Sequence, residues 1–108
     1  MNSRTYNDRL TVIIVSFLSN QIIENLINVI EKNIKVLVIE NSLDKKLKID
    51  LEKKFENVQV IIPIKNLGNG AGINLGFSLV KTKFSLYLDV DTVPDKDMIN
   101  ILLENTKK

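Results

Sequence analysis

Two aspartates separated by one residue are the sharpest chemical feature of the sequence. Asp89 and Asp91 follow an apolar run at residues 84–88. Two carboxylates held this close repel each other, and a divalent cation removes that cost. The cation can also bridge to a diphosphate and neutralise the charge that develops when the diphosphate leaves. The alternative is an ordinary turn, which the pair taken alone slightly favours, because aspartate is common in turns.

A glycine-rich segment at residues 66–76 is the second feature, and it holds all four glycines of the chain. Glycine lets the backbone approach a ligand closely, and the start of a following helix favours anions. The segment does not fit the dinucleotide fingerprint or the phosphate loop that ends in Gly-Lys-Ser/Thr. The alternative assigns Gly72 and Gly76 to a close contact between helix and sheet. That alternative leaves the polar side chains of Asn66 and Asn74 unexplained.

Polar residues also follow the first two apolar runs. Glu40, Asn41 and Ser42 come after the second run, and a carboxylate or amide there can bind the edge of a base or a ribose. Asn-Ser is equally ordinary turn chemistry. Ser16 and Phe17 follow the first run and could place a hydroxyl and a ring beside a base. For Phe17, a place in the core is slightly favoured.

Composition narrows the chemistry further. The chain has 108 residues, no cysteine and no histidine, and a net charge of +2. Disulfides, thiolate metal sites and histidine-based catalysis are therefore excluded, and a metal must be held by oxygen, which favours Mg²⁺ or Mn²⁺. Lysines are interleaved with acids, so no nucleic-acid surface is expected. No apolar run approaches the length of a transmembrane helix or signal peptide, which predicts a cytoplasmic protein.

The elements that must position these residues alternate regularly. Short β-branched and aliphatic runs predict strands at residues 10–15, 35–39, 58–62 and 84–88. Helical spacing predicts helices between them, with caps at Ser19 or Asn20, over residues 44–55 and 70–80, and a last helix capped by Asp95. This order predicts an α/β domain at residues 10–108, Rossmann-like, with a mainly parallel four-stranded sheet and helices on both faces. Residues 1–9 form a polar N-terminal extension. Ligands of such sheets bind beyond the carboxyl ends of the strands.

Together these four places resemble the N-terminal half of a family 2 glycosyltransferase of the inverting GT-A type. Residues 11–17 are similar to its opening strand, and residues 38–44 to its Val-Asp-Asn-x-Ser-x-Asp segment. Residues 66–76 resemble its Asn-x-Gly-x-(small)-x-x-Asn-x-Gly loop and helix. Residues 86–94 resemble its last strand and Asp-x-Asp signature. The resemblance covers residues 10–104, and its strength is that four weak motifs occur in the right order and spacing.

The resemblance implies a nucleotide-diphosphate sugar as partner, with UDP or dTDP favoured, and Mg²⁺ or Mn²⁺ as cofactor. Asp91 matches the metal ligand that holds the diphosphate. Asp89 matches the acid on the ribose or uracil side, and the two aspartates form the candidate metal site.

Roles for the other residues follow from the same resemblance. Glu40 or Asn41 matches the acidic position that reads the base, since the alignment slips by one residue there. Ser16 or Phe17 matches the contacts to the base. The positions near the nucleotide that match the loop are Asn66, Gly68 and Asn74. Glu40 replaces the usual aspartate, which adds a methylene where the base should lie.

The family's C-terminal half, with the acceptor site and the general base, has no counterpart in the sequence, which predicts a truncated domain that is inactive alone. One alternative is a non-catalytic nucleotide-binding fragment, or a domain completed by a second chain or a homodimer through an exposed sheet edge. Peripheral association with the inner face of the membrane is a further option. A haloacid-dehalogenase-type phosphohydrolase, with Asp89 as nucleophile and Asp91 as acid/base, fits the letters but not the position in the chain.

Overall fold

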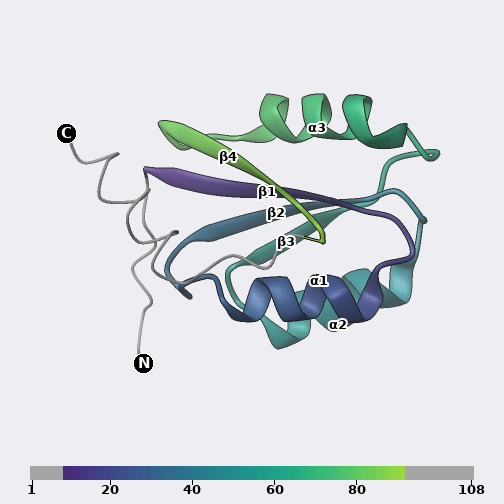
Figure 1. Ribbon diagram of the computed structural model, residues 1–108, viewed down its shortest axis with the longest axis horizontal. Helices are drawn as coiled ribbons and strands as arrows, with labels where there is room; N and C mark the ends of the chain where they lie inside the picture. Colours follow the sequence, from purple (N-terminus) through teal and green to yellow (C-terminus); the bar gives the residue numbers. More distant parts are fainter. Residues whose placement is uncertain (1–8, 92–108) are drawn as a thin grey trace.

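The computed structural model describes residues 9–91, which form one sheet with three helices (Figure 1). The elements alternate as the sequence predicts, within two residues at each boundary. In chain order they are β1 (Leu10–Ser16), α1 (Asn20–Asn28), β2 (Lys35–Glu40), α2 (Lys45–Lys54), β3 (Val58–Ile61), α3 (Gly68–Leu79) and β4 (Phe84–Asp89). The predicted last helix and nearly all of the predicted N-terminal extension lie outside the described residues.

All strand pairs are parallel, and the strand order is β3-β2-β1-β4. The predicted parallel α/β sheet is therefore confirmed. Every residue of β1 is buried, because this strand has a neighbour on each side and helices over both faces. The chain runs outward from β1 to β3 and then crosses back to place β4 on the other side of β1. That reversal of direction between β1 and β4 creates a crevice at the carboxyl ends of the strands.

Helices α1 and α2 cover one face of the sheet, and α3 covers the other (Figure 1). The larger core lies under α1 and α2, whose inward residues are Ile23, Leu26, Ile27, Leu47 and Leu51. The smaller core lies under α3 and is built on Val15, Leu37 and Ile39. Helices on both faces were expected because apolar side chains along β1 point in both directions.

Helix α2 begins at a side-chain cap, whereas α1 does not. The carboxylate of Asp44 accepts a hydrogen bond from the Leu47 N–H at 3.0 Å, which satisfies one of the free donors of the first turn. Ser19 occupies the cap position of α1 as expected, but its hydroxyl donates to the Phe17 carbonyl instead. Among residues 9–91, no helix combines the length and the apolar character needed to cross a bilayer.

Helix α3 lies against β1 through two glycines. A Cβ at Gly76 would stand 2.6 Å from Ile13 Cγ2, and one at Gly72 would stand 3.0 Å from Val15 Cγ1. The predicted close contact between helix and sheet is confirmed at both positions. It brings the start of α3 to the carboxyl end of β1, where the candidate site residues gather.

Candidate functional site

A cavity of about 400 Å³ opens at the carboxyl ends of β1 and β4. This volume is within the range of small-ligand pockets, roughly 300–1,000 Å³. Most of the residues that the sequence singled out line it, namely Ser16, Phe17, Asn41, Asn66, Gly68, Asp89 and Asp91. Two others, Glu40 and Asn74, are not among its lining residues. The cavity therefore joins the ends of four segments that are far apart in the sequence.

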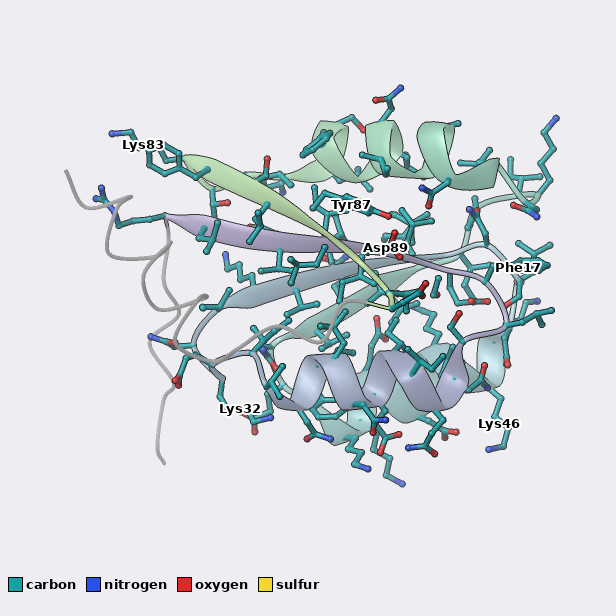
Figure 2. All side chains as sticks on the ribbon, in the orientation of Figure 1. Phe17, Lys32, Lys46, Lys83, Tyr87 and Asp89 are labelled. Atoms are coloured by element: carbon teal, nitrogen blue, oxygen red, sulfur yellow. The ribbon has the colours of Figure 1, made fainter. Side chains whose placement is uncertain are left out.

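The acidic pair at the end of β4 is exposed to solvent. Asp89 lies beside Val15 in the parallel register, and Figure 2 shows it on the ribbon beyond Tyr87, beneath α3. The Asp91 N–H lies 3.4 Å from Asp89 Oδ1, and this long contact is the only hydrogen bond of either carboxylate within residues 9–91. Within residues 9–91, both carboxylates therefore keep most of their capacity to accept hydrogen bonds or to bind a cation.

The donor set at this pair fits a hard divalent cation. Within residues 9–91 no cluster of three or more acidic side chains could enclose a metal. Two carboxylates are nevertheless a common protein contribution for Mg²⁺, which keeps several waters and takes its remaining ligands from phosphate oxygens. Asp89 and Asp91 can therefore hold an ion that is shared with a phosphorylated ligand.

Glu40 at the end of β2 is fully buried, in contrast to the aspartates. Its carboxylate accepts from Ser16 Oγ at 2.9 Å and from the Asp44 N–H at 2.8 Å. The Ser42 hydroxyl lies 2.7 and 2.6 Å from its two oxygens. The side chain of Glu40, including the extra methylene, therefore turns inward and ties β1 to the loop before α2.

Asn41 clamps the segment that leads into α3. Its Nδ2 donates to the Gly68 carbonyl at 2.9 Å, and its Oδ1 accepts from the Leu67 N–H at 3.2 Å. Asn66 closes a tight turn by accepting from the Gly68 N–H at 2.9 Å. Gly68 has a φ of +76°, a conformation that L side chains rarely adopt. The polar residues of this loop thus shape the cavity wall through contacts with the backbone.

The loop after β1 forms the opposite wall. Phe17 is 52% exposed and lines the cavity, so the slightly favoured core position for Phe17 is wrong. Figure 2 shows its ring at the edge of the molecule, beyond the end of β1. The next residue, Leu18, has a φ of +52°, and its N–H lies 3.3 Å from Ser42 Oγ. A non-glycine residue in this region is strained and persists only where its surroundings hold it.

Sequence reasoning missed two polar lining residues, and Asn74, like Glu40, lies outside the lining. Asn69 and Ser19 line the cavity, and Tyr87 Oη lies 3.5 Å from Asn69 Oδ1. Asn69 follows Gly68 directly. A glycine at the start of the helix was therefore the one sequence signal that the next side chain could face the cavity. Asn74 is exposed on α3, because Gly72 and Gly76 occupy the helix face that meets the sheet.

Asp44 belongs to the same edge of the sheet and has a shifted pKa. The hydrogen bond from the Leu47 N–H, and then the bond from Asn20, lower the pKa of its carboxyl below the usual value of 3.8. Both bonds favour the charged form. Asp44 is therefore committed to capping α2 and to holding α1 beside it.

A second cavity of about 370 Å³ lies at the amino ends of the strands, near Thr11, Lys35 and Thr82. The hydroxyls of Thr11 and Thr82 are 2.7 Å apart and bond to each other. Open parallel sheets bind ligands at their carboxyl ends, and this cavity is at the amino ends. The cavity at β1 and β4 is the better candidate.

Comparison with known proteins agrees with this geometry. The family model described as glycosyl transferase family 2 matches residues 11–108, nearly the whole chain. The chain belongs to glycosyl transferase family 2. The resemblance inferred from the four motifs is therefore confirmed. In the structure of this family 2 chain, the acidic pair and the start of the glycine-rich segment line one cavity.

Two solved structures share the fold. One is the crystal structure of S. aureus TarS 1-349, with a TM-score of 0.73, 24% identity, and coverage of 89% of this chain and 31% of that one. The other is the mannosyltransferase PcManGT from Pyrobaculum calidifontis in complex with GDP-Man and Mn²⁺, with a TM-score of 0.72, 17% identity, and coverage of 92% and 32%. This family 2 chain thus spans about a third of each structure. No curated protein matches the sequence.

Proposed function

We propose that this chain binds a nucleotide-diphosphate sugar through a divalent cation at Asp89 and Asp91, as the donor side of a glycosyl transfer. The main support is the exposed acidic pair, which lines the cavity at the carboxyl ends of β1 and β4, where the strand order reverses. Membership of glycosyl transferase family 2 supports the donor class. The Pyrobaculum protein was solved with GDP-Man and Mn²⁺, which supports the same combination of ligand and ion here.

Each wall of the cavity has a role in this proposal. Asp91 holds Mg²⁺ or Mn²⁺, and Asp89 faces the ribose and shares the ion. The cation supplies charge neutralisation for the leaving diphosphate. The exposed ring of Phe17 offers an apolar face on which a base can stack. Gly68 and Asn69, at the start of α3, form the side where the backbone can approach closely.

We place UDP or dTDP ahead of other nucleotides, on family resemblance. The acids that line the described part of the cavity are Asp89 and Asp91, both assigned to the donor. Inverting transfer also needs a carboxylate that deprotonates the acceptor hydroxyl. In this assignment neither Asp89 nor Asp91 is that base.

Calorimetry with UDP, dTDP and GDP sugars tests this proposal, each titrated with and without MnCl₂. We expect binding that requires the metal and weakens at least tenfold in Asp91→Asn, since losing even an outer-shell partner of a metal ligand costs about 10–100-fold in metal affinity. Asp50→Asn is the matched control, because Asp50 is an exposed carboxylate on α2 paired with Lys46. Binding that ignores both the metal and Asp91→Asn would refute the assignment.

The phosphohydrolase alternative gives a different result in a second assay. Turnover of p-nitrophenyl phosphate that disappears in Asp89→Asn would identify Asp89 as a nucleophile. We expect no such turnover, because the proposed role of Asp89 is to bind the donor. The two assays together separate a sugar-donor site from a phosphatase site.

A further inference from the structure

The carboxylate of Glu40 joins three segments at the rim of the cavity without lining it. It accepts from the hydroxyl of Ser16 at the end of β1 and from that of Ser42 after β2. It also accepts from the backbone N–H of Asp44, which caps α2. The side chain has no exposed surface. A ligand in the cavity therefore cannot reach this carboxylate without displacing the network.

The acceptor capacity of the carboxylate is directed inward. Oε1 receives Ser16 Oγ and Oε2 receives the Asp44 N–H, while the single proton of Ser42 lies between them at 2.7 and 2.6 Å. Ser42 in turn accepts from the Leu18 N–H at 3.3 Å. Through these bonds Glu40 is connected to the loop that carries Phe17. Fixing that loop fixes one wall of the cavity.

We propose that Glu40 is a positioning residue of the donor site, which sets the place of the β1–α1 loop and does not read the base. The inference rests on the proposed function, because it assigns Glu40 a part in nucleotide binding. Its neighbour Asn41 is also committed, since its amide binds Leu67 and Gly68. The acidic position of the motif thus acts through Ser42 and Leu18 on the wall that contains Phe17.

The length of the side chain supports this role. The carboxylate of Glu40 reaches the N–H of Asp44, four residues on, while also meeting Ser16 on the neighbouring strand. An aspartate would be shorter by one C–C bond, about 1.5 Å. From the same backbone position its carboxylate could not reach all of these partners at once, so at least one hydrogen bond would be lost. Glu40→Asp should therefore retain part of the effect, and Glu40→Gln should place an NH₂ donor against another donor.

The test is the affinity of Glu40→Gln and Glu40→Asp for UDP, CDP and GDP in the presence of MnCl₂, compared with the wild-type chain. A positioning residue should weaken all three by the same factor, about tenfold in Glu40→Gln and less in Glu40→Asp, because a misplaced wall acts on every nucleotide. The ratios between nucleotides should stay constant. A change of more than about threefold in those ratios would mean that Glu40 reads the base and would overturn the proposal.

Glu52→Gln is the matched control for stability. Glu52 also accepts a backbone N–H, from Val60 at 2.8 Å, and it bonds Lys48, but it lies away from the cavity. Its replacement should lower thermal stability and leave nucleotide affinity unchanged. Equal affinities for wild type and Glu40→Gln, measured on folded protein, would overturn the positioning role.

Amide hydrogen exchange separates failure of this inference from failure of the proposed function. Glu40→Gln should speed exchange at the Asp44 and Leu18 N–H groups, whose acceptors are Glu40 and Ser42. A wild-type chain that binds no nucleotide would refute the donor site and the nucleotide-positioning role together. Unchanged exchange at both amides would refute the network even if nucleotides bind.

Discussion

β2 and β4 both end in acidic residues at the carboxyl end of the sheet, but the side chains differ in burial and in hydrogen bonding. Glu40 at the end of β2 is buried and accepts from two hydroxyls and a backbone N–H. Asp89 and Asp91 at the end of β4 are exposed, and the one hydrogen bond of their carboxylates within residues 9–91 is 3.4 Å long. A carboxylate at a strand end is therefore available to a ligand only where the fold supplies no donors of its own.

The neighbours of each strand explain the difference. β2 lies between β1 and β3, so its end is surrounded by two loops whose serines and free N–H groups need acceptors. β4 pairs with β1 alone among the described strands, and within residues 9–91 no side chain donates a hydrogen bond to Asp89 or Asp91. Buried polar groups must be hydrogen-bonded, whereas exposed ones can leave water for a metal or phosphate. The carboxylate of Glu40 thus serves the fold, whereas those of Asp89 and Asp91 are open to a ligand such as the proposed donor.

Removing the buried carboxylate should have the largest effect on stability. Glu40→Ala leaves the Ser16 and Ser42 hydroxyls and the Asp44 N–H without their acceptor, and each unsatisfied buried donor costs about 1–3 kcal/mol. We expect a loss of about 3 kcal/mol in the free energy of unfolding, measured by urea denaturation. Ser16→Ala removes a single donor and should cost about 1 kcal/mol. A loss below 1 kcal/mol in Glu40→Ala would contradict the claim that Glu40, unlike Asp89 and Asp91, stabilises the fold.

The packing of α3 behind Asn41 should give the next largest effect. A methyl group at Gly72 would stand 3.0 Å from Val15 Cγ1 and 3.2 Å from Asn41 Nδ2, so Gly72→Ala should cost about 1–3 kcal/mol. Gly70→Ala, in the same helix, meets nothing within 4 Å and should be neutral or stabilising by up to about 1 kcal/mol. Thermal unfolding of the two variants checks this, and equal shifts would contradict it.

The pH dependence of α2 should be a smaller effect. Because the pKa of Asp44 is lowered in the folded chain, its stabilising contribution is present above 3.8 and is lost as pH falls through the lowered value. Asp44→Asn keeps a good cap but has no charge to lose. We expect the stability difference between wild type and Asp44→Asn to shrink as pH falls from 5 to below roughly 3.8. A difference that stays constant across this interval would contradict the assignment.

The exposed pair should give the smallest effect on stability and the largest on ligand binding. Asp91→Asn should change the free energy of unfolding by no more than about 0.5 kcal/mol, because no buried residue in the described range 9–91 accepts from or donates to its side chain. The same variant should lose metal-dependent nucleotide binding. Urea denaturation without metal, set beside calorimetry with MnCl₂, measures both. A destabilisation of 2 kcal/mol or more would mean that Asp91, like Glu40, serves the fold.

The strands, and the end of the sheet at which the candidate site lies, were predictable because near-continuous apolar runs separated by helical patterns specify a parallel sheet. The gathering of Ser16, Asn66 and Asp89 then followed, since parallel strands end at one edge. The direction of the Glu40 side chain did not follow. It depends on the register that sets Ser16 beside Glu40 and on a backbone N–H four residues later, neither of which the sequence displays.

Phe17 shows the opposite limit of sequence reasoning. An aromatic residue directly after a buried strand is usually packed inside, and hydrophobicity alone cannot tell core from cavity wall. The backbone decides, since the turn at Leu18, with a positive φ, follows directly and the ring stays 52% exposed. Asn74 lies outside the cavity lining for a related reason, because Gly72 and Gly76 determine which side of α3 meets the sheet.

The place of β4 in the strand order has a thermodynamic consequence. Among the described strands it is an edge, and the cavity residues Asp89 and Asp91 stand at its end. A segment that paired with the free side of β4 would lie next to the acidic pair. If that pairing raised the affinity for the donor by some factor, the donor would raise the affinity of the pairing by the same factor. Assembly along this edge and occupancy of the cavity would then act as mutual effectors.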